Sequence, residues 1–396
     1  MTGKPINLIL TVALISMIGP FSIDTYLPAF PSIETDLQVN RAVLSQTLGA
    51  YLLGFAVTTL FWGPLSDRIG RRNVMLGSIF LYSTSSVFCA IAQDFNVLLL
   101  SRILQGIAAS GGFVASRATI RDAFGNHQAQ RAMSYIMMLF SLAPAIAPIL
   151  GGWLHDIAGW RSIFYFLASY GMVAIVLILF SVPETLPVES RKSFHPAYVL
   201  RTYLGIVQNI RFMALVLSLA TGFAGLFLYI AGAPTVIFDF LGMGSNDFWV
   251  QFIPVTAGIL TGSWIASRLI HALGTTRVVN TAFLVIGLGC MSNIIQLWWL
   301  PTNPVTVILP IVIYATGLTM AMPGITISAL DCFAENRGAA AAMQSCNQMI
   351  INAVVASVAV PLLSGKLLYF VAGQACCFLA AWGLWRLSNS NRPALT

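Results

Sequence analysis

The sequence predicts an all-α membrane protein with twelve transmembrane helices in two pseudo-symmetric six-helix bundles. The first observation behind this prediction is composition. Of the 396 residues, 58% are hydrophobic and only 8% are charged, whereas a soluble domain carries about 25% charged residues. The second is that apolar runs continue over about 20 residues, the length of a membrane-spanning helix, whereas a transmembrane β-barrel would alternate apolar and polar residues. Soluble, fibrous and disordered proteins are therefore excluded.

Twelve apolar segments are each long enough to cross roughly 30 Å of hydrocarbon. They comprise residues 6–28, 42–65, 73–92, 95–118, 132–155, 161–182, 211–237, 247–270, 277–298, 303–329, 339–364 and 367–387. The longest polar interruption divides the chain into a bundle of residues 1–182, a linker of residues 183–209 and a bundle of residues 210–396. Within the linker, apolar residues at helical spacing predict a short helix on the membrane surface.

The third observation is how the charges are distributed over the loops. Most basic residues fall on the face that carries the N-terminus, and only Arg41, Arg161 and Lys366 fall on the opposite face. Because basic loops stay in the cytoplasm, we expect both termini and the linker to be cytoplasmic. The formal net charge of +7 is thus explained as a topology signal, and no nucleic-acid partner is expected.

Of the 33 Asp, Glu, Lys and Arg residues, 31 can be placed at or near the membrane surfaces, and two cannot. Asp24 lies in the outer half of the first segment, and Arg102 lies in the fourth. A charge at the bilayer centre costs at least ~2.5–3.5 kcal/mol, so such residues usually face a cavity or a partner. Asp24 is the candidate proton carrier, because desolvation favours a protonated carboxyl group and a nearby guanidinium favours the carboxylate. Arg102 keeps its proton and suits a fixed counter-charge.

Each of these two residues has an alternative interpretation. Asp24 could cap its helix at the outer water interface, just before Pro28. Arg102 could clamp backbone carbonyl groups of a neighbouring helix. Both alternatives stay open from the sequence.

The loop after the second segment predicts a conformational latch. Gly63 allows close helix contact, and Asp67 could sit against a helix N-terminus, where the helix dipole favours an anion. We expect this N-terminus to be the start of the eleventh segment, near Arg337. Arg71 has a potential partner in Asp122. The alternative is that the arginines of this loop only anchor the topology.

The fifth segment combines prolines with small residues, namely Pro144, Pro148, Gly151 and Gly152. Small residues permit tight helix approach and prolines allow bending. This segment is therefore a candidate hinge, and the alternative is an ordinary packed, kinked helix.

Candidate substrate-cavity residues are aromatic, sulfur-containing or amide side chains within the spans, because such side chains form adaptable surfaces for mixed apolar ligands. They are Tyr26, Tyr51, Gln105, Met137, Met138, Phe140, Phe223, Phe227, Tyr229 and Phe252. Any one of them could instead face lipid or a neighbouring helix.

Several chemistries have no signature in the sequence. The six cysteines are scattered without metal-ligand spacing, so they are interpreted as small apolar helix residues and no metal site is expected. No phosphate-binding loop, nucleophile elbow or metalloprotease motif is present. We therefore expect neither an enzyme nor a cofactor.

Several of these segments resemble signatures of the major facilitator superfamily. Residues 63–72 (GPLSDRIGRR) resemble its loop 2–3 signature and residues 99–106 (LLSRILQG) its fourth-span signature. Residues 147–152 (APILGG) resemble its antiporter signature, but Ala143 and Ala147 stand where glycine is usual. Residues 24–31 (DTYLPAFP) and 117–122 (RATIRD) resemble the bicyclomycin- and chloramphenicol-resistance (Bcr/CflA) branch of the drug–proton antiporters.

The resemblance implies the major facilitator fold and proton-driven export of antibiotics such as chloramphenicol or bicyclomycin from the bacterial cytoplasm. The expected substrate path runs between the bundles, with protons, a small-molecule substrate and the lipid bilayer as partners, and the protein is expected to be a monomer of the inner membrane. The alternative within transport is a dedicated exporter of one metabolite, such as an amino acid, a nucleoside or a siderophore. A membrane-embedded enzyme and a passive channel are alternatives from other classes.

Overall fold

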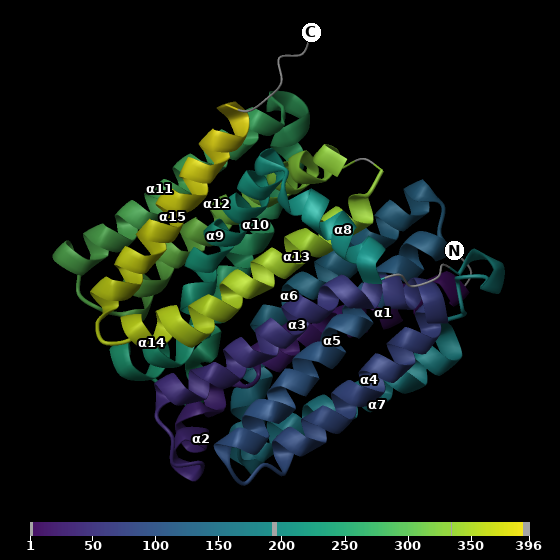
Figure 1. Ribbon diagram of the computed structural model, residues 1–396. Coiled ribbons are helices and arrows are strands. Elements are labelled where there is room, and N and C mark those ends of the chain that lie inside the picture. The colour runs from purple at the N-terminus through teal and green to yellow at the C-terminus, as the bar shows by residue number, and fades with distance from the viewer. Residues whose placement is uncertain (1–2, 192–195, 334, 391–396) are drawn as a thin grey trace. The chain divides into compact units, whose positions relative to one another are not determined.

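The computed structural model describes residues 3–191, 196–333 and 335–390, and in these ranges the regular elements are all helices. The chain divides into two compact units, Met1–Val199 (unit 1) and Leu200–Thr396 (unit 2). Among the described residues, twelve helical segments are long and apolar enough to cross a membrane, which confirms the predicted fold class. Figure 1 shows the long helices of each unit packed side by side.

Unit 1 contains six membrane-spanning segments, the first of which is interrupted. Its helices are α1 (Gly3–Asp24), α2 (Phe30–Asp36), α3 (Arg41–Ile69), α4 (Arg71–Ala90), α5 (Phe95–Ala123), α6 (Asn126–Ala158) and α7 (Arg161–Ser181). The first span was expected to end near residue 28, but a 3₁₀ turn at Leu27–Ala29 joins α1 to α2, and the span continues to Asp36. Pro28 and Pro31 lack the N–H groups that a continuous helix would use.

Helices α3 and α5 of unit 1 begin at capping side chains, and α4 begins at a glycine. The side chains of Asn40 and Asp94 accept hydrogen bonds from the third residue of α3 and α5, respectively, as N-cap residues do. Between α3 and α4, Gly70 has φ of +103°, a backbone conformation that favours glycine. Glycine at position 70 therefore allows the chain to turn sharply from α3 into α4.

Close approach of α3 and α5 depends on small residues. At Gly106 of α5, a Cβ atom would collide with the backbone carbonyl group of Tyr51 on α3. At Gly54 of α3, a Cβ atom would lie 2.8 Å from the carbonyl oxygen of Ile103. Glycine is therefore required from both sides of this contact, and this close contact brings Tyr51 and Arg102 together.

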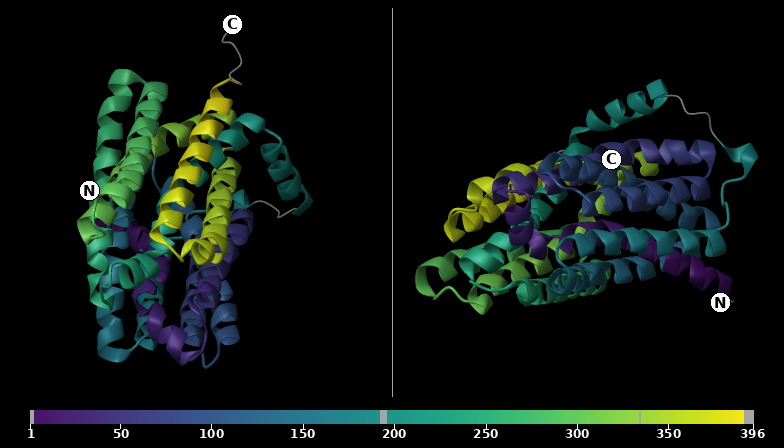
Figure 2. Two further views of the ribbon diagram at one scale, coloured as in Figure 1. Left: turned by 90° about the vertical axis from the view of Figure 1, so that its left-hand side faces the viewer. Right: turned by 90° about the horizontal axis from the view of Figure 1, so that it is seen from below.

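Unit 2 contains the other six spans. Its helices are α9 (Ile210–Ala231), α10 (Trp249–Leu273), α11 (Thr275–Trp299), α12 (Pro304–Leu330), α13 (Arg337–Val354), α14 (Val360–Leu363) and α15 (Leu367–Ser390). Two π-helical turns, Thr235–Phe240 and Val355–Ala359, interrupt the regular geometry after α9 and after α13. Figure 2 shows these helices from two further sides.

A short helix, α8 (Pro196–Val207), lies between the sixth and seventh spans. It overlaps the segment of the linker for which the sequence predicts a surface helix. The boundary between the two units falls inside α8, between Val199 and Leu200.

We predict that Gly106→Ala destabilises unit 1 by about 1–3 kcal/mol, the usual cost of overpacking, because the added methyl group meets rigid backbone rather than a flexible side chain. Thermal unfolding of the detergent-solubilised protein measures this. Gly77→Ala in α4 is the control, because nothing lies within 4 Å of a Cβ at Gly77. Equal melting temperatures for the two variants would contradict the prediction.

Candidate functional site

The side chain of Arg102 on α5 is fully buried. Its guanidinium carbon lies 4.9 Å from the ring centroid of Tyr26, 4.6 Å from that of Tyr51 and 5.9 Å from that of Phe164. Cations are attracted to aromatic faces at such distances, most strongly where water is excluded. Helices α3, α5 and α7 and the segment after α1 therefore meet around one positive charge.

Hydrogen bonds extend this arrangement outward from the guanidinium group. Arg102 Nη1 donates to Gln105 Oε1 at 2.5 Å, and Gln105 Nε2 donates to Ser86 Oγ at 2.7 Å. The hydroxyl groups of Tyr26 and Thr47 are 3.0 Å apart. Three of the predicted cavity residues, Tyr26, Tyr51 and Gln105, thus surround Arg102.

Arg102 keeps hydrogen-bonding capacity that the protein does not use. Its Nε and Nη2 atoms are buried and have no acceptor among the described residues. A buried charged donor without an acceptor is costly. The sequence left open that Arg102 clamps backbone carbonyl groups of a neighbouring helix. Among the described residues, its one hydrogen bond goes instead to the side chain of Gln105.

Asp24 is the last residue of α1 and only 4% of its surface is exposed. Among the described residues, no ion pair or hydrogen bond involves its carboxylate, and the partners of Arg102 are rings and an amide. The expected Asp24–Arg102 pair is thus absent from this structure.

The fifth span lies against the segment that follows Asp24. At Gly151 of α6, a Cβ would collide with the backbone of Thr25, so this glycine is required for close contact. Gly152 is buried beside it, and Pro144 and Pro148 lie within α6, which is assigned as one helix. The hinge role of these four residues stays a prediction.

At the arginine-rich end of unit 1, Arg71 is 4% exposed and joins two carboxylates. Its Nε lies 3.0 Å from Asp122 Oδ2, and its Nη1 lies 2.6 Å from Asp67 Oδ1. The structure therefore contains the Arg71–Asp122 pair that the sequence suggested. Gly63 lies in α3, and a Cβ there would make ordinary contact with Val114 of α5. The latch role of these residues stays a prediction, as does the contact of Asp67 with the start of α13.

Glu184 is a residue of this end that the sequence analysis did not identify. Its Oε1 accepts a hydrogen bond of 3.0 Å from the backbone N–H of Arg71, and its Oε2 accepts one of 3.2 Å from that of Arg72. A carboxylate on the first N–H groups of α4 satisfies donors that the helix leaves free. No local pattern could reveal this contact, because 112 residues separate Arg72 from Glu184.

The remaining candidate cavity residues are spread over helices α6, α9 and α10. On α6, Met138 is 56% exposed and Met137 is 38% exposed, and Phe140 is half-buried. In unit 2, Phe223 stacks on Phe227 with ring centroids 6.2 Å apart. Tyr229 and Phe252 are buried, the latter stacked on Phe248.

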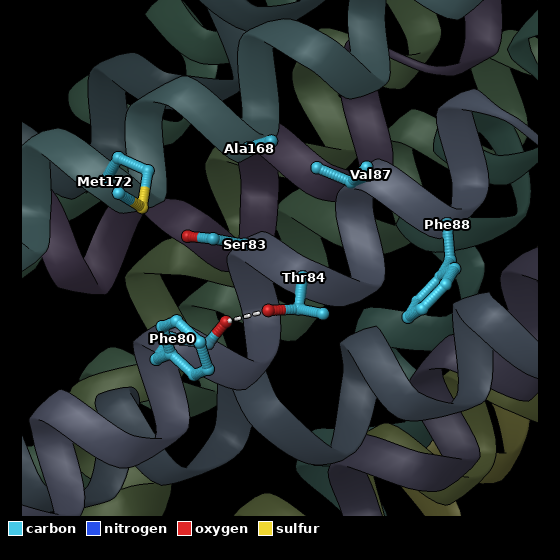
Figure 3. Close-up of a pocket in the computed structure, with 7 residues that line it drawn as sticks. All are labelled: Phe80, Ser83, Thr84, Val87, Phe88, Ala168 and Met172. Atoms are coloured by element: carbon cyan, nitrogen blue, oxygen red, sulfur yellow. Dashed lines mark hydrogen bonds between the residues drawn. The ribbon is translucent and has the colours of Figure 1, made fainter.

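A separate apolar groove of about 210 Å³ lies between α4 and α7 (Figure 3). It is lined by Phe80, Ser83, Thr84, Val87, Phe88, Ala168 and Met172. The hydroxyl groups of Ser83 and Thr84 already donate to carbonyl groups of their own helix. The groove therefore offers no free donor for recognition, and it contains none of the predicted site residues.

Metal chemistry has no candidate site in the described part of the chain, where no three or more histidine, cysteine, aspartate or glutamate side chains come together. The six cysteines are all free.

Comparison with known proteins identifies a family. The model of the Major Facilitator Superfamily matches residues 12–356. The chain is 31% identical over 362 residues to "Uncharacterized MFS-type transporter YdgK" of Bacillus subtilis (strain 168), covering 89% of each chain. It is 28% identical over 277 residues to "Bicyclomycin resistance protein homolog" of Haemophilus influenzae, covering 70% of each. It is also 28% identical over 364 residues to "Multidrug resistance protein D" of Escherichia coli (strain K12), covering 89% and 88%.

Solved structures show the same fold at low identity. A bacterial homolog of the human lysosomal transporter Spinster superposes with a TM-score of 0.77 at 14% identity and covers 99% of this chain and 98% of its own. A D-xylose-proton symporter superposes with a TM-score of 0.75 at 16% identity, covering 97% and 98%.

We predict that Glu184→Ala lowers the stability of unit 1 by about 1–2 kcal/mol, the upper range for loss of a helix cap, because it frees two backbone donors at the start of α4. Thermal unfolding in detergent provides the measurement. Glu189→Ala, an exposed carboxylate in the same connecting segment, is the matched control. The prediction is wrong if both variants unfold at the wild-type temperature.

Proposed function

The chain belongs to the major facilitator superfamily, whose members are transporters and not enzymes, and we propose that it exports small, partly apolar compounds in exchange for protons. Relatives named for bicyclomycin and multidrug resistance agree with the Bcr/CflA branch that the sequence motifs indicated. By this proposal the compounds include antibiotics of the chloramphenicol or bicyclomycin type. The protein would act in the bacterial inner membrane, with both termini in the cytoplasm.

The observation that carries the proposal is a pair of buried charges in unit 1, neither of which has an ion partner among the described residues. Asp24 is 4% exposed and Arg102 is 0% exposed, and both lie within candidate spans. Such residues cost several kcal/mol at membrane depth and mark transport and proton pathways. A purely structural role would pair them with each other or with a neighbour, as Arg71 is paired with Asp122.

Asp24 is the proposed proton carrier. A buried carboxylate without a cation beside it is strongly disfavoured, and protonation relieves this cost. When the surroundings of Asp24 open to water on one side, the ionised form is again solvated and the proton leaves. Alternating exposure to the two sides of the membrane therefore carries a proton inward, down the pH gradient, once in each full transport cycle.

Arg102 is the proposed fixed charge and a donor to the transported compound. Its Nη1 atom is held by Gln105, while Nε and Nη2 remain free to donate to a carbonyl or hydroxyl oxygen. Tyr26 and Tyr51 supply aromatic surface around the same group. Apolar rings beside a few polar donors are typical of sites for small, partly apolar ligands.

Transport in proteoliposomes tests the proposal. With purified protein, an imposed pH gradient should drive accumulation of chloramphenicol or a similar compound against its concentration gradient. Mutual inhibition by chemically unrelated drugs is expected for a multidrug exporter, whereas its absence would indicate a dedicated exporter. A rate of substrate transport that is the same with and without a pH gradient would overturn the proton-exchange mechanism.

We predict that Asp24→Asn abolishes uphill, pH-driven transport, because the amide cannot exchange a proton, while binding of the compound persists. Uptake driven by a pH gradient and equilibrium binding, measured on the same preparation, separate the two effects. Glu189→Gln, which alters a carboxyl group outside the spans, should transport normally. Wild-type uphill transport by Asp24→Asn would remove Asp24 from the mechanism.

A further inference from the structure

Unit 2 contains a buried cluster of neutral polar side chains, which we call the amide cluster. It consists of Tyr229 on α9, Gln251 on α10, Asn293 and Gln296 on α11, and Gln374 on α15. Each of the five residues is at most 1% exposed. Helix α15 packs against both α9 and α11 (Figure 1), and Gln251 reaches the end of α9 from α10.

Hydrogen bonds connect four members of the amide cluster. Asn293 Nδ2 donates to the hydroxyl oxygen of Tyr229 and to Gln374 Oε1, each at 2.8 Å. Gln251 Nε2 donates to the backbone carbonyl oxygen of Tyr229 at 2.8 Å. Gln296 lies one helical turn after Asn293, so its side chain is on the same side of α11.

The cluster has more hydrogen-bonding groups than the protein satisfies. The unpartnered atoms within the described part of the chain are Asn293 Oδ1, Gln374 Nε2, Gln251 Oε1, and both Oε1 and Nε2 of Gln296. Donors and acceptors are both present, and all of them are buried. Leaving such groups unsatisfied is costly, above all at membrane depth.

An irregular stretch of backbone begins beside this cluster. Helix α9 ends at Ala231, two residues after Tyr229, and a π-helical turn follows at Thr235–Phe240. The hydroxyl group of Thr235 is also buried without a partner. Broken helices persist at membrane depth where side chains and ordered water satisfy the freed polar groups. Gln251 donates to the carbonyl group of Tyr229 in the last turn of α9.

We propose that the amide cluster binds internal water molecules beside the end of α9. The ligand must both donate and accept hydrogen bonds, since unpartnered groups of both kinds occur, and water does so with about three partners. A cation is disfavoured because none of the five side chains carries a negative charge. Water would link Gln296 to the rest of the cluster and hold the end of α9 to α11 and α15 without an ion pair. This proposal does not depend on the transported compound.

Hydroxyl-radical footprinting by X-ray radiolysis of the full-length protein in detergent tests the proposal, because radicals formed from bound water label adjacent side chains even when these are buried. Tyr314 is the internal control. It is equally buried in unit 2, and its hydroxyl group donates to the carbonyl oxygen of Gly222. We expect labelling of Tyr229 to be several-fold faster than that of Tyr314. Equal protection of the two tyrosines would overturn the proposal.

A variant locates the water. Gln296→Met removes both unpartnered amide atoms while keeping a side chain of similar length, and it should lower the rate of Tyr229 labelling toward that of Tyr314. Ser292→Ala on the same helix is the matched control, because its hydroxyl group donates to the carbonyl oxygen of Gly289, and labelling should be unchanged. Wild-type labelling of Tyr229 in folded Gln296→Met, checked by size-exclusion chromatography, would overturn the assignment of water to this cluster.

Discussion

The organisation of unit 1 depends on keeping one guanidinium group out of water within a membrane-spanning bundle. Arg102 cannot shed its charge, so the bundle must provide an environment that tolerates it. Aromatic faces from three different segments and one amide provide that environment. This environment forms only if α3 and α5 approach each other closely, which glycine at positions 54 and 106 permits.

At the arginine-rich end of the same unit, the buried arginine is paired with carboxylates. There Arg71 is held between Asp67 and Asp122, and Glu184 binds the start of α4. These contacts connect the ends of α3, α4 and α5 to the segment after α7. Because partners are present, the charges stabilise a defined arrangement of helix ends. Asp24 and Arg102, by contrast, have no ion partner within the described part of the chain, and this difference is the reason that we propose a transport role for them and not for Arg71.

The two units use different polar chemistry in their interiors. In unit 1, an aspartate and an arginine are buried deep in the spans. In unit 2, the buried polar side chains of the described residues are neutral, with Tyr229, Asn293 and Gln374 forming the connected core of the amide cluster. Neutral amides need no counter-charge, only hydrogen-bonding partners, so water can satisfy them. The proton-exchange chemistry proposed here therefore belongs to unit 1.

The sequence by itself determined the number of spans and the class of protein, because hydrophobic length and charge content are properties of each segment alone. It also indicated Asp24, Arg102 and the Arg71–Asp122 pair, since charges in apolar segments are visible without a structure. Only the tertiary structure decided which way each side chain points. It showed that Arg102 is surrounded by rings rather than by Asp24, that Glu184 binds the start of α4, and that Gln251 and Asn293 bond to Tyr229 while Gln374 bonds to Asn293. These outcomes depend on helix rotation and on contacts between residues far apart in the chain, neither of which a local pattern encodes.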